Sequence, residues 1–160
     1  MTRTTRNVLV LAAFLLIVYA VSALGALSTG PAVKGWYTTI QKPAWTPPSW
    51  LFGPVWITLY TMMAVAAWLV WRRRDNPGRG VALTAFAVQL ILNAVWSPLF
   101  FGLHRIDLAL IDIAGLWLAI LLTILLFFRI RPAAGWLLVP YLLWCTYAGA
   151  LNLALWRLNA

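Results

Sequence analysis

Five long runs of apolar residues follow one another along the chain, and polar segments separate them. Each run reaches the length of about 20 mostly apolar residues that a helix needs to cross a bilayer. A transmembrane β-barrel would instead show short segments in which apolar and polar residues alternate. The pattern therefore predicts an all-α integral membrane protein, one domain (residues 1–160) built as a bundle of five transmembrane helices, at residues 8–27, 50–71, 81–101, 108–128 and 133–156.

The connection between the first two runs, residues 28–49, is much longer than the others. Loops of more than about 12–15 residues are usually lids, binding loops or disordered segments. This loop holds Trp36, Tyr37 and Trp45 together with four prolines. The aromatic rings supply area to bury, and proline reduces the entropy lost on ordering. We expect a structured lid over one end of the bundle; the alternative is a loop that lies on the headgroups with tryptophan as its anchor.

Composition supports the membrane assignment and affects how the net positive charge of the chain is interpreted. Hydrophobic residues make up 64% of the chain and charged residues only 9%, against about 25% charged in soluble domains. A net charge of +9 would suggest nucleic acid in a soluble protein. Here the basic residues stand at the ends of apolar runs, where they orient helices and meet anionic headgroups. We therefore expect membrane lipid and no nucleic acid as a partner.

The distribution of lysine and arginine predicts an orientation. The side of the N-terminus carries eight of the twelve basic residues, namely Arg3, Arg6, Arg72, Arg73, Arg74, Arg79, Arg129 and Arg131. The opposite side carries Lys34, Lys42, Arg105 and Arg157. Basic residues concentrate on the cytoplasmic side of a membrane. In a bacterial cell membrane this bias places the N-terminus in the cytoplasm.

Residues that could catalyse acid–base or metal chemistry are few. The chain has one histidine, His104, in the short connection after the third run, and one cysteine, Cys145, inside the fifth run. Metal sites need several ligands at close spacing, and phosphate-binding glycine loops are absent. We expect no metal and no resident cofactor, and the sequence argues against hydrolysis and phosphoryl transfer.

Three polar residues lie inside predicted spans. Asp112 lies about one turn into the fourth run, and an ionisable group in a span is a functional candidate by default; an interhelical hydrogen bond is the structural alternative. Gln89 and Asn93 stand four residues apart and share one helix face. Amides on such a face either hold helices together or offer hydrogen bonds to a ligand.

Tryptophan is unusually frequent, with 11 of 160 residues, and its spacing predicts a pocket. Trp144 shares a helix face with Ala148 and Leu151, and Phe52 shares one with Trp56. Helix packing alone explains either stripe. Indole faces on several helices beneath an aromatic loop, however, fit a pocket for a planar apolar ligand.

Several motifs resemble the TspO family, the tryptophan-rich sensory proteins of bacteria and the mitochondrial translocator protein, or peripheral benzodiazepine receptor. The resemblance runs from about residue 36 to residue 159 and is carried by Trp45-Thr46-Pro47-Pro48 with Pro54-Val55-Trp56, by Asn93 with Trp96 and Pro98, and by Pro140-Tyr141 with Trp144. It implies a five-helix bundle, usually a homodimer, with a ligand cavity beneath the first loop. Family ligands are porphyrins such as protoporphyrin IX, cholesterol in mitochondrial members, and synthetic drugs.

Positions that match the family imply which residues form the pocket. They are Ala26, Phe52, Gly53, Trp56, Asn93, Leu108, Trp144, Ala148 and Leu151, with Trp45 in the lid. Two departures weaken other family properties. Leu153 stands where mitochondrial members have the tyrosine of a sterol-recognition stretch, which argues against strong sterol binding. Thr84 and Val88 replace the glycines of a dimer face on the third helix.

Three functions remain open from the sequence. The first is a membrane receptor or transport-type protein that binds porphyrins and has a sensing or regulatory role. The second is a light-dependent porphyrin-degrading enzyme in which Trp56 and Trp144 would be the reactive groups. The third is a sterol- or lipid-binding membrane protein.

Overall fold

The computed structural model describes residues 2–160 and is helical in all its regular structure. Five long helices are apolar enough to cross a membrane, which confirms the predicted five-helix membrane bundle. They are α1 (Arg3–Lys34), α3 (Phe52–Trp71), α4 (Arg79–Ser97), α5 (Ile106–Ile130) and α6 (Pro132–Asn159). Three short elements complete the chain: α2 (Trp36–Thr39), the 3₁₀ turn η1 (Ser49–Leu51) and the π-helical turn η2 (Pro98–Gly102).

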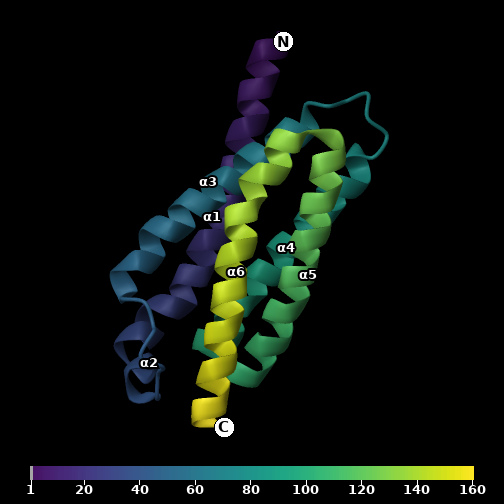
Figure 1. Cartoon of the computed structure of the whole chain (residues 1–160). Coiled ribbons are helices and arrows are strands. Elements are labelled where there is room, and N and C mark those ends of the chain that lie inside the picture. Colours follow the sequence, from purple (N-terminus) through teal and green to yellow (C-terminus); the bar gives the residue numbers. More distant parts are fainter. Residues whose placement is uncertain (1) are drawn as a thin grey trace.

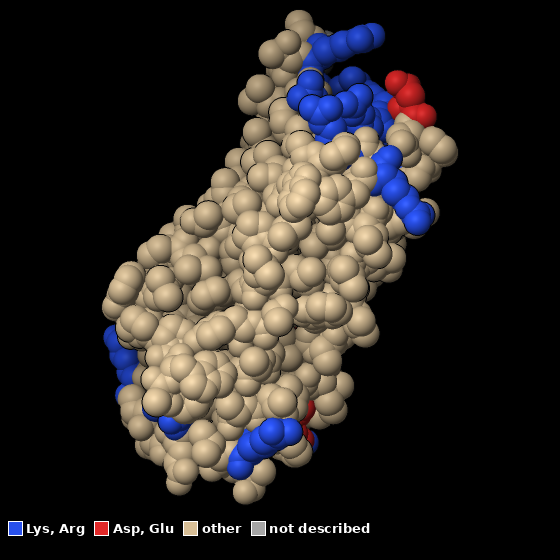
Figure 2. Space-filling view, viewed as in Figure 1, with Lys and Arg blue, Asp and Glu red and all other residues tan. Residues whose placement is uncertain are grey.

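The two ends of the bundle are built differently. The start of α1, the α3–α4 loop and the α5–α6 turn lie at one end, while α2 and the C-terminus lie at the other (Figure 1). On the face shown in Figure 2, charged side chains occur only at these two ends, with an uncharged belt between them. Large apolar side chains such as Leu16 and Leu118 are exposed on this outer surface. Such a surface suits lipid, which solvates leucine as well as a protein core does.

The first helix is longer than the sequence pattern predicts. The expected loop of residues 28–49 begins late, because α1 continues through Pro31 to Lys34 and residues 40–48 form the irregular part. Gly30 and Pro31 look like helix breakers in the sequence. In the structure the hydroxyl of Thr29 donates to the carbonyl of Gly25 (2.9 Å) and lies 2.7 Å from the hydroxyl of Ser97 on α4. This tertiary contact holds the last turns of α1 in helical form.

The third apolar run also ends in a way that the sequence only partly predicts. Pro98 removes a backbone donor, so a bend is expected near it. The α-helix stops at Ser97 and a single π-helical turn follows. In this turn the backbone N–H of Leu103 bonds to the carbonyl of Pro98 at 2.8 Å. The next residue, His104, has a positive φ of 55° and stacks its ring on Trp36, with the ring centroids 4.3 Å apart.

The core has two parts. The larger cluster fills the centre of the bundle, where the buried alanines Ala64, Ala66 and Ala67 let α3 approach its neighbours closely. The smaller cluster lies at the end that carries α2 and joins Phe100, Ile106, Ala109, Leu151 and Leu155. Trp36, Tyr37 and Ile40 from the first loop pack against it. The loop therefore belongs to the folded structure.

Candidate ligand-binding site

An aromatic cluster joins α3 to α6 at the end of the bundle below the first loop. Phe52 at the start of α3 meets Trp144 of α6 edge to face, with ring centroids 5.8 Å apart. One turn further along α3, Trp56 packs on Tyr60 at 5.3 Å and on Tyr141 of α6 at 6.2 Å. The structure thus brings together the three aromatic residues that the helical spacing predicts for the pocket.

The first loop is fastened over this cluster by Tyr147. The hydroxyl of Tyr147 donates to the backbone carbonyl of Trp45 at 2.8 Å, and the two rings lie 5.7 Å apart. Tyr147 also packs on Trp144 at 5.8 Å. The chain of contacts from Trp45 through Tyr147 to Trp144 places the predicted lid residue next to the predicted pocket. Trp45 itself keeps 48% of its surface exposed.

A second contact fixes the loop to the end of α6. The backbone N–H of Gln41 donates to Oδ1 of Asn159 at 2.9 Å, and Nδ2 of Asn159 donates to the carbonyl of Gln41 at 2.9 Å. Such a paired hydrogen bond fixes the orientation of both groups. Together with Tyr147 it makes the first loop a structured cap on the bundle, as its aromatic and proline content predicts.

Asn93 is the polar centre beneath the aromatic cluster. The hydroxyl of Tyr60 on α3 donates to Oδ1 of Asn93 at 2.5 Å, and Nδ2 of Asn93 donates to the hydroxyl of Tyr141 on α6 at 2.9 Å. All three residues are buried. The amide therefore links three helices. Of the two roles that the sequence leaves open for this amide, the structure shows the interhelical one.

The remaining predicted residues fall into two groups. Ala148 is half-buried one turn beyond Trp144, and Leu151 is buried in the smaller core cluster next to the site. The second group lies outside both core clusters. Ala26 on α1 and Gly53 on α3 are exposed, and Leu108 in the first turn of α5 belongs to neither core cluster.

Sequence reasoning overlooked three tyrosines as site residues. Tyr60 stands four residues after Trp56, and Tyr141 and Tyr147 stand three residues on either side of Trp144. These spacings put each tyrosine on the face of a predicted pocket residue. Their hydroxyls supply the polar contacts of the site, so helical spacing alone could have found them.

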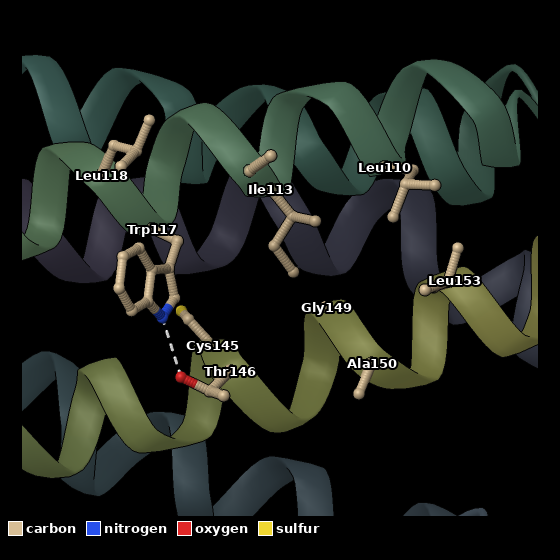
Figure 3. A pocket seen from close by; sticks show the side chains of 10 residues that line it. Leu110, Ile113, Trp117, Leu118, Cys145, Thr146, Gly149, Ala150 and Leu153 are labelled. Atoms are coloured by element: carbon tan, nitrogen blue, oxygen red, sulfur yellow. Dashed lines mark hydrogen bonds between the residues drawn. The ribbon is translucent and has the colours of Figure 1, made fainter.

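Two apolar grooves lie on the outer surface, away from the aromatic cluster. The first, of about 450 Å³, runs between α5 and α6 and is crossed by a 2.8 Å hydrogen bond from Nε1 of Trp117 to the hydroxyl of Thr146 (Figure 3). The second, of about 440 Å³, lies between α4 and α5 and includes Thr84 and Val88. None of the residues predicted for the pocket lines either groove.

Groups that could bind a metal do not gather in residues 2–160. No three His, Cys, Asp or Glu side chains in this part of the chain are close enough to hold an ion. Cys145 is buried in the central cluster, and the ring of His104 packs on Trp36. Apart from the tyrosine hydroxyls and the Asn93 amide, the groups around the site are aromatic and apolar. The arrangement suits recognition of a flat apolar molecule by ring contacts.

Comparison with known proteins agrees with this architecture. The model of the TspO/MBR family matches residues 13–157. The tryptophan-rich protein TspO of Archaeoglobus fulgidus is 41% identical over 154 residues, which cover 96% of this chain and 99% of that protein. Protein CrtK of Rhodobacter capsulatus is 40% identical, with 89% and 91% covered, and the human translocator protein is 39% identical, with 78% and 75% covered. The chain is therefore a multi-pass membrane protein that belongs to the TspO/MBR family.

Proposed function

We propose that this protein binds porphyrins, such as protoporphyrin IX and related tetrapyrroles, between α3 and α6 beneath the first loop. Binding would serve a sensing or regulatory role, as in a receptor or a transport-type protein. The observation that carries the proposal is the cluster of Phe52, Trp56 and Trp144, with Trp45 fastened above it. Indole faces and edges offer a planar macrocycle a large contact area. Two relatives, a tryptophan-rich sensory protein of Cereibacter sphaeroides and the bovine translocator protein, have names that agree with a sensing or transport role.

Binding in this place requires the aromatic rings to separate. Phe52 and Trp144 touch edge to face, so a macrocycle can insert only if the start of α3 moves away from α6. The first loop must release its bond from Tyr147 at the same time. Loop and lid motions of this kind occur on a microsecond to millisecond timescale. We therefore expect the structured loop to control access to the site.

Basic side chains at the loop end suit the propionate groups of a porphyrin. Lys42 lies over the ring of Tyr37, with Nζ 4.8 Å from the ring centroid. Lys34 is the last residue of α1, eight positions earlier in the sequence. Arg105 at this end is already paired with Asp107 at 2.6 Å. Lys34 and Lys42 are the candidates for charge-assisted hydrogen bonds to carboxylates.

The test is a titration of the purified, reconstituted protein with protoporphyrin IX, once in darkness and once under illumination. We expect saturable quenching of tryptophan fluorescence and an unchanged porphyrin spectrum in both. A loss of the porphyrin bands that needs both light and protein would replace the binding role by the light-dependent enzyme, with Trp56 and Trp144 as reactive groups. Quenching that does not saturate would refute porphyrin binding and leave sterol or lipid as the ligand.

A further inference from the structure

One end of the bundle carries a positive charge that the protein itself does not neutralise. Eight arginines lie at the ends of helices there, and Asp75 is the one carboxylate among them. Figure 2 shows basic side chains gathered at the end where Figure 1 marks the N-terminus, with acidic atoms at the edge of this group. The one ion pair within residues 2–160, between Arg105 and Asp107, lies at the other end.

Three helices meet at this end in a fixed arrangement. Nε1 of Trp68 on α3 donates to the carbonyl of Asn7 on α1 at 2.9 Å, which fixes the first turns of α1 against the end of α3. Nη1 of Arg79, the first residue of α4, donates to the carbonyl of Trp71, the last residue of α3, at 3.4 Å. The basic residues at these helix ends are therefore held near one another by contacts between the helices.

Two guanidinium groups are also positioned by stacking. The guanidinium of Arg74 lies over the ring of Trp71, and that of Arg72 lies over Trp68, each 4.7 Å from the ring centroid. Stacking of this kind attracts arginine to an indole face. It keeps both charges at the level where the apolar part of α3 ends, which is where tryptophan meets the headgroups in membrane proteins.

The arginines at this point repel one another. The pKa of the Arg74 guanidinium is lowered from its ordinary value. The largest cause is desolvation, and the next are the positive charges of Arg6, Arg79 and Arg3. Nε of Arg6 is buried and has no hydrogen-bond partner. A buried polar atom without a partner calls for an explanation such as a bound ion. Arginine does not give up its proton in proteins. A bound anion would therefore reduce the repulsion among the arginines and give Nε of Arg6 a hydrogen-bond partner.

We propose that Arg6, Arg74 and Arg79 form a binding site for the phosphate of an anionic membrane phospholipid. The site lies at the end of three apolar helices, so a bound lipid can keep its acyl chains in the membrane while its phosphate meets the guanidinium groups. Arginine is well suited to phosphate because its planar fork donates two parallel hydrogen bonds. The α4 N-terminus adds a positive dipole end, with no acidic residue in its first turn. A lipid whose headgroup has no ammonium group suits the net charge best.

The experiment compares lipids on the full-length protein in a neutral detergent. Dioleoylphosphatidylglycerol and dioleoylphosphatidylcholine are titrated separately, and bound lipid is counted by native mass spectrometry. Inorganic phosphate is then added to the phosphatidylglycerol complex as a competitor. We expect phosphatidylglycerol to bind more tightly than phosphatidylcholine and Arg74→Gln to weaken it roughly tenfold, since a hydrogen bond to a charged group has about that effect. Arg74 is exposed, so this variant should fold normally.

The matched control is Arg131→Gln, which removes one exposed charge from the same end of the bundle. We expect this variant to bind phosphatidylglycerol as the wild type does. An equal loss in both variants would show a diffuse surface charge and overturn the site. Equal binding of the two lipids would overturn it as well. Displacement of phosphatidylglycerol by millimolar inorganic phosphate would assign the site to free phosphate and reject the lipid.

Discussion

At the scale of single residues, the polar atoms inside the bundle decide how the aromatic site is held. The amide of Asn93 bonds to the hydroxyls of Tyr60 and Tyr141, and Oδ1 of Asn152 accepts a hydrogen bond from the indole N–H of Trp96. Spacing in the sequence identified Asn93 and the aromatic residues at positions 52, 56 and 144. It could not identify the bond of Asn152 to the carbonyl of Ile106 on α5, because that partner is set by tertiary packing and not by position along one helix.

We expect Asn93→Leu to lower the stability of the protein by about 1–2 kcal/mol, because two buried hydroxyl groups lose their partner. Thermal unfolding in detergent measures the change. The control is the double variant Tyr60→Phe with Asn93→Leu, which also removes one of the hydroxyl groups left without a partner. We expect the double variant to be only slightly less stable than Asn93→Leu alone. Additive losses in the double variant would contradict a shared hydrogen-bond network.

At the scale of elements, the helix ends depend on contacts that a local pattern does not contain. The sequence pattern predicts all five spans, but it ends α1 seven residues early, because the Thr29–Ser97 contact lies across two helices. It also gives no hint of the close approach at the α5–α6 turn. There a Cβ on Gly135 would lie 2.6 Å from the ring of Phe128.

We therefore expect Gly135→Ala to destabilise the protein by about 1–3 kcal/mol, the usual cost of overpacking. Gly115→Ala on α5 is the matched control, since its Cβ would meet no atom within 4 Å and alanine favours a helix more than glycine does. Melting temperatures of the two variants in the same detergent give the comparison. If Gly135→Ala were as stable as Gly115→Ala, the α5–α6 turn would have room for a Cβ beside the ring of Phe128, which would contradict the close approach.

At the scale of the whole molecule, the two ends have different tasks. The arginine-rich end carries charge, and the other end carries the structured loop over the aromatic site (Figures 1 and 2). Charge counting along the sequence placed each basic residue on one of two sides, and the positions of the helix ends agree with that division. Homodimerisation is a prediction from family resemblance alone. Thr84 and Val88, which stand where some members have the glycines of a dimer face, line the groove between α4 and α5.

The charge asymmetry predicts a cytoplasmic N-terminus in a bacterial cell membrane. A Thr4→Cys variant in intact cells should then resist a membrane-impermeant maleimide, whereas Ala160→Cys should react. Native Cys145 is buried and should label slowly in either variant. Rapid labelling of Thr4→Cys with protection of Ala160→Cys would reverse the orientation.

The central claim is that a porphyrin binds against Trp144 between α3 and α6. The direct test is the dissociation constant of protoporphyrin IX for Trp144→Phe and Trp56→Phe, measured in the dark by porphyrin absorbance. Trp136→Phe is the control, because Trp136 lies on the same helix with 66% of its surface exposed. We expect the first two variants to bind several-fold more weakly and remain folded, and Trp136→Phe to bind as the wild type does. Unchanged affinity in both site variants would contradict the assignment of porphyrin binding to this site.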